Sequence, residues 1–451
     1  MYEQTLILDL GNVLFHWSTQ TLIALPPTHL HSVLLSPSWG AHERGELTQE
    51  QAIDRIDIKA VKKSMKGKLK VYAMTNISDV DFALLKATLE DWDLFDGVFT
   101  SFGAGMRKPE LEFYRKVLKE TGALPENSIF VDDKIDNVIV ARTFGLTGIV
   151  FESANGLIRT QHNLYFDQIT RGQAYLKENA GNHKSQIENG PEFEDAFSQF
   201  LIYEITNSPA LIQLHDSKTT IQLGKVNPIA KFQSEARVWN YFISPPVGTT
   251  KNFPDDVDTT SCSLLALSPP KTSADAILDA ILANRNDEGL VQTYFDPSRP
   301  RVDPVVLANV VRAFYKYDRG DEVEKSFDWV RSTLLHRGYV NGTLHYYSAE
   351  SFLFFVSMLV ADNKHHTEIE ALEEPLMKRL TERVGHRDDS LAVAMRILAC
   401  QAELQETDGG WEIGWVCRYG RSRKRIGNRG VVTAYAVKGL EGDRKPTSVD
   451  I

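Results

Sequence analysis

Residues 6–13 read Leu6-Ile7-Leu8-Asp9-Leu10-Gly11-Asn12-Val13, a short apolar run that ends on a carboxylate. A continuous apolar run of this length is typical of a strand buried on both faces of a sheet. Further β-rich runs alternate with amphipathic segments. With the first, Thr5–Leu8, they are Leu69–Met74, Gly97–Ser101, Ser128–Val131 and Thr147–Phe151. This alternation predicts a doubly wound parallel α/β domain over residues 1–152 of a multidomain chain.

Polar side chains follow four of these predicted strands: Asp9, Thr75 with Asn76, Lys108, and Asp132 with Asp133. Ligands of open α/β folds bind at the carboxyl ends of the strands, so we expect these groups to meet at one edge. An aspartate is a weak nucleophile towards a phosphate dianion, and Mg²⁺ with a lysine offsets the repulsion. A lone strand-end aspartate is more often a helix cap, so the prediction depends on all four groups together.

In this order the four motifs resemble those of the haloacid-dehalogenase (HAD) superfamily, over roughly residues 1–152. The resemblance implies that Asp9 is a nucleophile and that Thr75, Asn76 and Lys108 hold phosphate. It further implies a Mg²⁺ site formed by Asp9 together with Asp132 and Asp133.

Two features depart from that superfamily. Many of its phosphatases place a second aspartate two residues after the nucleophile as general acid and base, and here that residue is Gly11. The segment before Thr75 is also short for a cap: His42–Leu47 matches a cap helix, but the chain soon reaches Lys66–Leu69. We therefore expect a small, truncated helical cap. An active phosphatase and a retained scaffold both stay open.

The rest of the chain has a different pattern. Residues 153–204 are polar and mostly helical, which favours a bridge between domains. From residue 205 to 451 the strand signal fades and helical periodicity dominates between loops rich in Pro, Gly and Asp. This pattern predicts an all-α domain.

Residues 254–260 of that domain read Pro254-Asp255-Asp256-Val257-Asp258-Thr259-Thr260. Protonation of an unactivated alkene needs a neutral carboxylic acid in an apolar pocket. Clustered carboxylates share protons because like charges at close range cannot all ionise. The neighbouring threonines donate hydrogen bonds without adding charge. Read alone, however, the segment favours an acidic N-cap at the start of a helix.

A second motif lies downstream, where residues 405–411 read Gln405-Glu406-Thr407-Asp408-Gly409-Gly410-Trp411. It matches the QW motif of triterpene cyclases, although Asp-Gly-Gly alone is simply a turn. The two motifs together resemble class II terpene cyclases, whose QW residues tie adjacent helices of an α/α barrel (the β-domain of terpene cyclases). The resemblance implies Asp258 as the proton donor, Asp256 as its polarising neighbour and Thr259 as a substrate-side group.

A HAD-like domain followed by one barrel domain with Asp-x-Asp-Thr-Thr resembles the drimane-type sesquiterpene cyclases of drimenol and albicanol pathways. Segments 294–309 and 426–430 also look similar to that family. The resemblance implies that farnesyl diphosphate is cyclised to a bicyclic drimane diphosphate in secondary metabolism. An active HAD domain would then release the alcohol. Two alternatives stay open: a phosphatase with a non-catalytic C-terminal domain, and a non-catalytic remnant.

Aromatic and basic residues gather near the predicted loops. Ring faces stabilise cations, so we expect about a third of the aromatic residues to touch substrate and most of them to be core residues. The aromatic residues are Trp239, Tyr241, Phe242, Phe253, Tyr294, Phe295, Tyr346, Tyr347, Phe352, Trp411, Trp415 and Tyr419. The basic residues are Arg418, Arg421, Arg423, Lys424, Arg425 and Arg429. A solvated loop is one interpretation, and a diphosphate grip with Arg429 as the preferred ligand is the other.

Composition limits the remaining possibilities. A chain of 451 residues predicts two to three domains. A net charge of −10 argues against a general nucleic-acid binder, which needs cationic surface. The cysteines, Cys262, Cys400 and Cys417, have neither disulfide-framework nor metal-ligand spacing. No signal peptide and no membrane-spanning run is found, so we expect a cytoplasmic enzyme without stable membrane insertion. The oligomeric state is not predicted.

Overall fold

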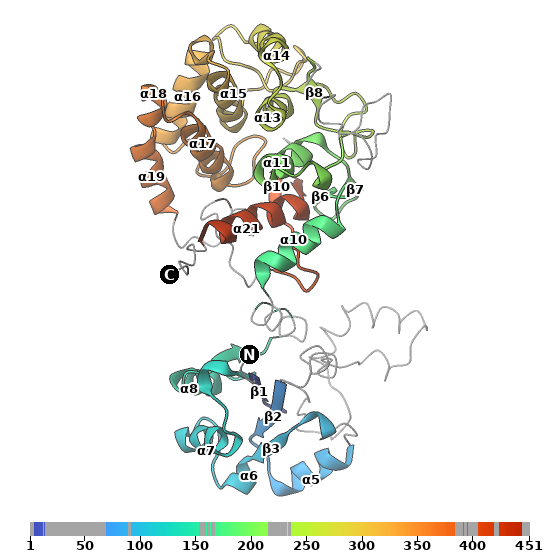
Figure 1. The fold of residues 1–451 in the computed structure, drawn as a ribbon, viewed down its shortest axis with the longest axis vertical. Coiled ribbons are helices and arrows are strands. Elements are labelled where there is room, and N and C mark those ends of the chain that lie inside the picture. Colours follow the sequence, from blue (N-terminus) through green and yellow to red (C-terminus); the bar gives the residue numbers. More distant parts are fainter. Residues whose placement is uncertain are drawn as a thin grey trace, which may run out of the picture. The chain divides into compact units, whose positions relative to one another are not determined.

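The computed structural model describes residues 4–11, 13, 69–88, 92–152, 159, 163, 167–214, 232, 236–383, 391, 395, 405–418 and 424–443. It divides into two compact units, Met1–His162 and Asn163–Ile451 (Figure 1). The expected cap, including His42–Leu47, lies outside the described residues. So do Asn12, Cys400, Tyr419, Arg421 and Arg423.

The first unit holds a five-stranded parallel sheet in the order β3-β2-β1-β4-β5. Its strands are β1 Gln4–Leu8, β2 Leu69–Thr75, β3 Gly97–Thr100, β4 Ser128–Asp132 and β5 Thr147–Val150. The five predicted strands are thereby confirmed. The chain crosses from β3 to the other side of β1, so β1 and β4 are neighbours. Such a switch in strand order opens a crevice at the carboxyl ends of the strands, where ligands bind.

Helical segments cover both faces of this sheet. They are α5 Asp79–Thr88, η1 Trp92–Leu94, α6 Ser101–Ala104, α7 Leu111–Thr121, η2 Pro125–Asn127 and α8 Ile135–Thr143. Ile7 and Phe130 pack in one cluster with residues of α7 and α8. Ala73 packs in a second cluster with Leu85 of α5. Two clusters on one sheet are what a doubly wound domain requires, and they fix the strand ends that carry the polar residues.

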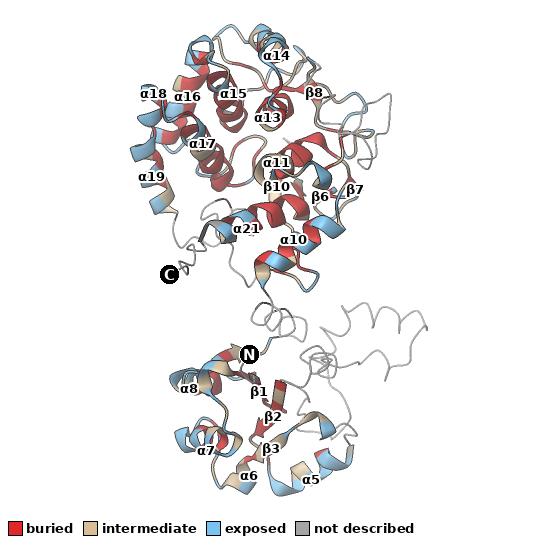
Figure 2. Cartoon of the chain, viewed as in Figure 1, coloured by how far each residue is buried: buried red, intermediate tan, exposed pale blue. Residues whose placement is uncertain are grey.

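The second unit is mainly helical. Its helices are α10 Gln168–Glu178, α11 Ala196–Thr206, α13 Val257–Leu267, α14 Lys271–Ala283, α15 Pro304–Lys316, α16 Glu324–Leu335, α17 Ala349–Asn363, α18 Thr367–Glu370, α19 Glu373–Glu382 and α21 Arg429–Asp443, with short turns η3 Pro209–Leu211 and η4 Gly320–Val323. Helices α11, α13, α15 and α17 pack in succession, and their buried residues share one hydrophobic core (Figure 2). Closure of these helices into an α/α barrel stays a prediction.

The second unit also contains short strands that the sequence analysis missed. Strands β6 Ser185–Ile187, β7 Glu192–Phe193, β10 Trp415–Arg418 and β11 Arg425–Gly427 form an antiparallel sheet in the order β10-β11-β6-β7. Strands β8 Trp239–Asn240 and β9 Asp255–Asp256 form an antiparallel pair. The prediction of an all-α domain misses this sheet, because strands of two to four residues are too short to show an alternating pattern.

The segment expected as a bridge, 153–204, lies partly within this second unit. Helix α10 packs against α21, and α11 packs against both α13 and α21. Ile169 and Phe200 belong to the main core of the unit. Their burial against the later helices is the physical reason that the contact boundary falls at His162 rather than near residue 204. None of the described helices has the length and apolar content needed to cross a membrane.

Candidate active sites

Asp258, the predicted acid, lies in the first turn of α13 with 8% of its surface exposed. Asn309 of α15 donates a hydrogen bond from Nδ2 to Oδ1 of Asp258 at 2.9 Å. The hydroxyl of Tyr346, just before α17, donates to Oδ2 at 2.5 Å. Three separate segments of the core therefore converge on one buried carboxyl group.

This environment suits a proton donor. Burial raises the pKa of Asp258 to about 6, although the hydrogen bonds from Tyr346 and Asn309 oppose the shift. The neutral carboxyl group, which proton donation requires, is therefore the main form below about pH 6 and a minor form at pH 7. The same two donors and the N-terminus of α13 stabilise the carboxylate that remains after the proton leaves.

Asp256 and Thr259 lie beside this acid. Asp256 is the N-cap of α13, because its Oδ1 accepts a hydrogen bond from the Thr259 backbone N–H at 2.7 Å. Burial raises the pKa of Asp256 well above its usual range, and the neighbouring Asp258 adds to the shift. Within the described part of the chain, Oδ2 of Asp256 and Oγ1 of Thr259 are buried and have no hydrogen-bond partner. The two interpretations of this segment are therefore compatible, since Asp256 caps the helix that carries Asp258.

These groups line a cavity of about 500 Å³, which is within the usual size range of small-molecule sites. Its aromatic wall consists of Phe197, Tyr241, Phe253, Tyr294 and Tyr346. Four of these were in the predicted aromatic set, and Phe197 was not. Its polar wall includes Asp256, Asp258, Thr259, Thr293 and His345. The combination of an acid and aromatic faces fits a reaction that passes through carbocations.

Three cations line the same cavity: Arg299, Arg301 and Arg418. Arg299 forms an ion pair with Asp296 at 3.2 Å and donates to Oγ1 of Thr250 at 2.9 Å. Arg418 donates to backbone carbonyls, with Nε 3.2 Å from Leu344 O. Arg301 donates to the Pro300 carbonyl at 2.9 Å. Among the described residues neither Arg301 nor Arg418 has a carboxylate within ion-pair distance, so both have charge available for an anionic ligand.

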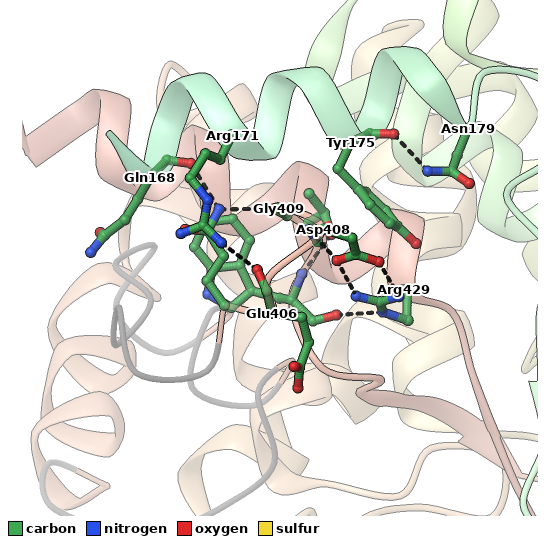
Figure 3. Close-up of polar contacts among 12 residues, drawn as sticks. Gln168, Arg171, Tyr175, Asn179, Glu406, Asp408, Gly409 and Arg429 are labelled. Atoms are coloured by element: carbon green, nitrogen blue, oxygen red, sulfur yellow. Dashed lines mark hydrogen bonds and ion pairs between the residues drawn. The ribbon is translucent and has the colours of Figure 1, made fainter. Parts of the chain in front are cut away.

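Arg429, the preferred diphosphate ligand, is not in the described wall of this cavity. Its two terminal nitrogens each lie 2.9 Å from a carboxylate oxygen of Asp408, and its Nε donates to Trp411 O at 2.9 Å (Figure 3). Its guanidinium also stacks on the ring of Tyr175 in α10. Arg429 therefore holds two residues of the QW motif, Asp408 and Trp411, in place. Its positive charge is already neutralised by Asp408.

The Gln of the QW motif is likewise structural. Gln405 donates from Nε2 to Gln168 O at 2.9 Å and accepts from Arg171 of α10 at 3.0 Å. Arg171 also donates to Glu406 O (Figure 3). The motif thus fastens its loop to α10, while Arg429 fastens it to α21.

In the first unit, three of the predicted residues meet at the carboxyl ends of β1 and β4. Nζ of Lys108 lies 2.9 Å from Oδ1 of Asp9 and 2.6 Å from Oδ2 of Asp132. Burial raises the pKa of Asp9, and the adjacent Lys108 opposes this shift. Asp9, Asp132 and Asp133 each have a carboxylate oxygen within 4.8 Å of the others. Carboxylate oxygens are the ligands that Mg²⁺ prefers, so this set fits that ion.

The remaining predicted residues of this unit take different positions. Thr75 is buried at the end of β2. The side chain of Asn76 binds the backbone of Lys108, donating to its carbonyl at 2.9 Å and accepting from its N–H at 2.8 Å. Asn76 therefore orients Lys108, and because its Nδ2 carries a second hydrogen, contact with phosphate stays a prediction. Gly11 leaves the position two residues after Asp9 without a side chain.

Comparison with known proteins now bears on both sites. A family model described as the sesquiterpene cyclase astC-like C-terminal domain matches residues 169–317. Drimenol cyclase drtB of Aspergillus calidoustus is 37% identical over 494 residues, covering 99% of this chain and 90% of the relative. The chain belongs to the drimenol cyclase family.

One further relative and one solved structure each match about a third of this drimenol cyclase family member. Sesquiterpene phosphatase astK of Aspergillus oryzae is 34% identical over 170 residues, 32% of this chain and 87% of the relative. A HAD family enzyme of Bacteroides thetaiotaomicron, solved with magnesium and inorganic phosphate, is 18% identical and covers 33% of this chain and 94% of its own, with a TM-score of 0.24. The predicted family and the predicted enzyme class, a terpene cyclase joined to a HAD-like domain, are confirmed by the full-length relative.

Several residues of the cyclase site had no assigned role in the sequence analysis. Asn309 ends the segment 294–309, whose only signal is its similarity to the family, and the sequence around His345 offers no signal for a site residue. Arg301 lies in that same segment and offers a usable signal, because it is two residues after Arg299 and two residues before the capping residue Asp303. A basic pair before a helix cap is consistent with the edge of an anion site.

Proposed function

We propose that this chain is a class II sesquiterpene cyclase that protonates the terminal alkene of farnesyl diphosphate through Asp258. The observation that carries the proposal is a buried carboxyl group, held by Asn309 and Tyr346, in the wall of a cavity that also presents cations. Membership of the drimenol cyclase family supports it, since the full-length relative is named as a drimenol cyclase.

The reaction begins with transfer of the Asp258 proton to the alkene carbon that leaves a tertiary cation. Two neighbouring double bonds then close two rings in turn, and the positive charge ends on the second ring. The rings of Tyr241, Phe253 and Tyr294 stabilise the cations and keep water away. Asp258 is left as a carboxylate that Asn309 and Tyr346 continue to bind.

We assign the diphosphate to Arg301 and Arg418, with Arg299 close by on the same wall. Arg301 is the principal ligand, because its guanidinium has no carboxylate partner among the described residues. Arg299 is divided between Asp296 and the Thr250 loop. Guanidinium groups bind phosphate oxygens through paired hydrogen bonds, which anchors the substrate while its hydrocarbon chain folds.

We further propose that the HAD-like unit removes the two phosphates of the cyclised product one after the other, the first step leaving a monophosphate and the second the alcohol, with Asp9 as the nucleophile in both. Lys108 lies between Asp9 and Asp132, where its charge offsets the repulsion between the nucleophile and a phosphate. Mg²⁺, when bound by Asp9, Asp132 and Asp133, supplies further positive charge for the same purpose. Because Gly11 offers no acid, release of a poor alkoxide leaving group is the slow step of this unit.

The decisive experiment incubates the purified chain with farnesyl diphosphate and Mg²⁺ and extracts the products with and without added phosphatase. A bicyclic alcohol that appears directly supports both activities. A bicyclic alcohol that needs added phosphatase supports cyclisation alone. Recovery of only farnesol or starting material contradicts the cyclase assignment.

A further inference from the structure

We propose that His345 is the base that takes the final proton from the cyclised cation and thereby fixes where the product carries its double bond. The inference rests on the proposed cyclase function and goes beyond it, because nothing in the acid or the arginines determines how the reaction ends.

The position of His345 supports this role. Its ring is part of the cavity wall and meets the ring of Tyr294 edge to face, with centroids 5.7 Å apart. The next residue, Tyr346, contacts the acid, so acid and base belong to the same lining segment. Both the N–H and the C=O of His345 are fixed, by Asp303 Oδ2 at 2.9 Å and by Arg418 N–H at 2.9 Å.

The imidazole packs against Tyr294, but no hydrogen bond to its Nε2 fixes its orientation in the described structure. Nε2 of His345 is buried and has no hydrogen-bond partner among the described residues. A buried polar atom without a partner is costly and calls for an explanation. The torsion about the Cβ–Cγ bond of a histidine is broad, so the ring can turn a nitrogen towards a bound substrate while the backbone stays in place. A fixed backbone with an uncommitted imidazole is suited to proton transfer.

The surroundings of His345 keep this imidazole unprotonated. Burial lowers the pKa of His345 below its usual 6.5, the carboxylate of Asp303 opposes the shift, and Arg301 and Arg418 reinforce it. Among the described charged groups, these three have the largest effect on the His345 pKa. A neutral imidazole has a free lone pair, which a base requires.

The other described residues of the cavity are poorer bases at neutral pH. Burial raises the pKa of Asp256 well above its usual range, so its carboxyl group favours the protonated form. Asp258 is a carboxylate once it has given its proton, but both of its oxygens then accept hydrogen bonds, from Asn309 and Tyr346. Burial also raises the pKa of the Cys417 thiol to about 12 and that of the Tyr346 phenol well above its usual range. The arginines are cations. His345 is therefore the best proton acceptor that the described wall offers.

The step balances in atoms and charge. A nitrogen lone pair of His345 takes a proton from a carbon next to the cationic centre, and the electrons of that C–H bond become the new double bond. The imidazolium then releases its proton to solvent as the product leaves. Asp258 takes up one proton from solvent for the next turnover, so the cycle is neutral overall.

The test compares the products of wild type with those of His345→Phe and His345→Gln, measured by gas chromatography and mass spectrometry after phosphatase treatment. Phe keeps a ring without nitrogen, and Gln keeps a polar group that is only weakly basic. Both variants should still consume farnesyl diphosphate. The share of the wild-type alkene should fall about tenfold or more, in favour of isomeric alkenes and water-captured alcohols.

His183 provides the matched control. It is also a buried histidine whose Nε2 lacks a partner in the described structure, and burial lowers its pKa to about 4. It is not in the described cavity wall, so His183→Asn should leave the product ratio unchanged. An unchanged product in both His345 variants overturns the proposal and assigns deprotonation to the diphosphate or to water. Folded His345 variants that consume no substrate also overturn it, while a wild type that forms no bicyclic product refutes the cyclase function instead.

Discussion

The hydroxyl oxygen of Tyr346 lies 2.5 Å from Oδ2 of Asp258, although 88 residues separate the two along the chain. The Tyr346 ring is held edge to face by Phe197 and Phe355, so the hydroxyl has a fixed direction. A donor fixed in this way costs no reorganisation when Asp258 becomes anionic. The contact therefore strengthens the acid by stabilising its conjugate base.

Tyr346→Phe removes this donor and keeps the ring. Because hydrogen bonds to charged groups contribute roughly 1.5–3 kcal/mol, kcat for cyclisation should fall about 10- to 100-fold. Tyr339→Phe is the matched control, since Tyr339 is also buried but stacks on Phe352 and is not in the described cavity wall. Equal losses in the two variants would show that the effect is general destabilisation.

Cyclisation should depend on pH through Asp258. Its pKa is raised to about 6, and only the protonated form donates, so kcat/KM should be constant well below pH 6 and fall tenfold per pH unit well above it. The measurement is initial cyclisation rate between pH 5 and 8, with product collected by extraction. A rate that rises with pH across this window would contradict the assignment of Asp258 as the acid.

The same shift predicts an effect on stability. The folded protein holds the Asp258 proton more tightly than the unfolded chain, whose pKa is about 3.8, so the free energy of unfolding should fall as pH rises from about 4 to 6. The Asp258→Asn side chain does not ionise, so its free energy of unfolding should not fall over this pH range. Above pH 6 the stability of this variant relative to wild type should therefore be up to about 3 kcal/mol greater than it is at pH 4. Denaturant unfolding at pH 4 and pH 7.5 measures the difference. If the variant and wild type differed in free energy of unfolding by the same amount at pH 4 and pH 7.5, the pKa of Asp258 would not be raised in the folded protein.

Arg301→Ala should change KM but not stability, and Arg429→Ala should change stability but not KM. Loss of Arg301 should raise KM for farnesyl diphosphate about tenfold or more with little change in thermal stability, because it removes a ligand for the diphosphate. Loss of Arg429 should lower Tm by several degrees and leave KM unchanged, because Arg429 holds Asp408 and Trp411 O. If KM increased only in the Arg429 variant, Arg429 and not Arg301 would be the ligand of the diphosphate.

The HAD-like unit is tested by Asp9→Asn and Gly11→Asp. Asp9→Asn, or removal of metal by a chelator, should stop phosphate release. Gly11→Asp places a carboxyl group where an alkoxide leaving group needs a proton, so alcohol formation should increase about tenfold or more. Gly11→Asn is the control for size, and phosphate is measured together with the alcohol. Phosphate release that persists in Asp9→Asn would rule out this nucleophile.

The features that could be predicted from the sequence are those that depend on residues close together along the chain. The five strands and the meeting of Asp9, Lys108 and Asp132 follow from apolar runs and from the rule that parallel strands end at one edge. The sequence placed Asn76 at the same edge as a phosphate ligand but did not show its contact with the Lys108 backbone, because that contact depends on how two loops pack.

The cyclase site shows the limit of such reasoning more clearly. The acid itself was found from its segment, but its partners Asn309 and Tyr346 come from other helices, and only tertiary packing brings them to Asp258. Arg429 lies close in sequence to the QW motif, and that nearness suggested a ligand. Sequence alone did not show that Asp408 already binds its guanidinium.

The most direct test of the central claim compares wild type with Asp258→Asn on farnesyl diphosphate. Asparagine keeps the shape of the side chain and still accepts from Asn309, but it has no proton to give. We predict bicyclic drimane products from wild type and a loss of at least about a thousandfold in the folded variant, with phosphate release by the HAD-like unit assayed in parallel. Bicyclic products formed by the variant at the wild-type rate would contradict this prediction.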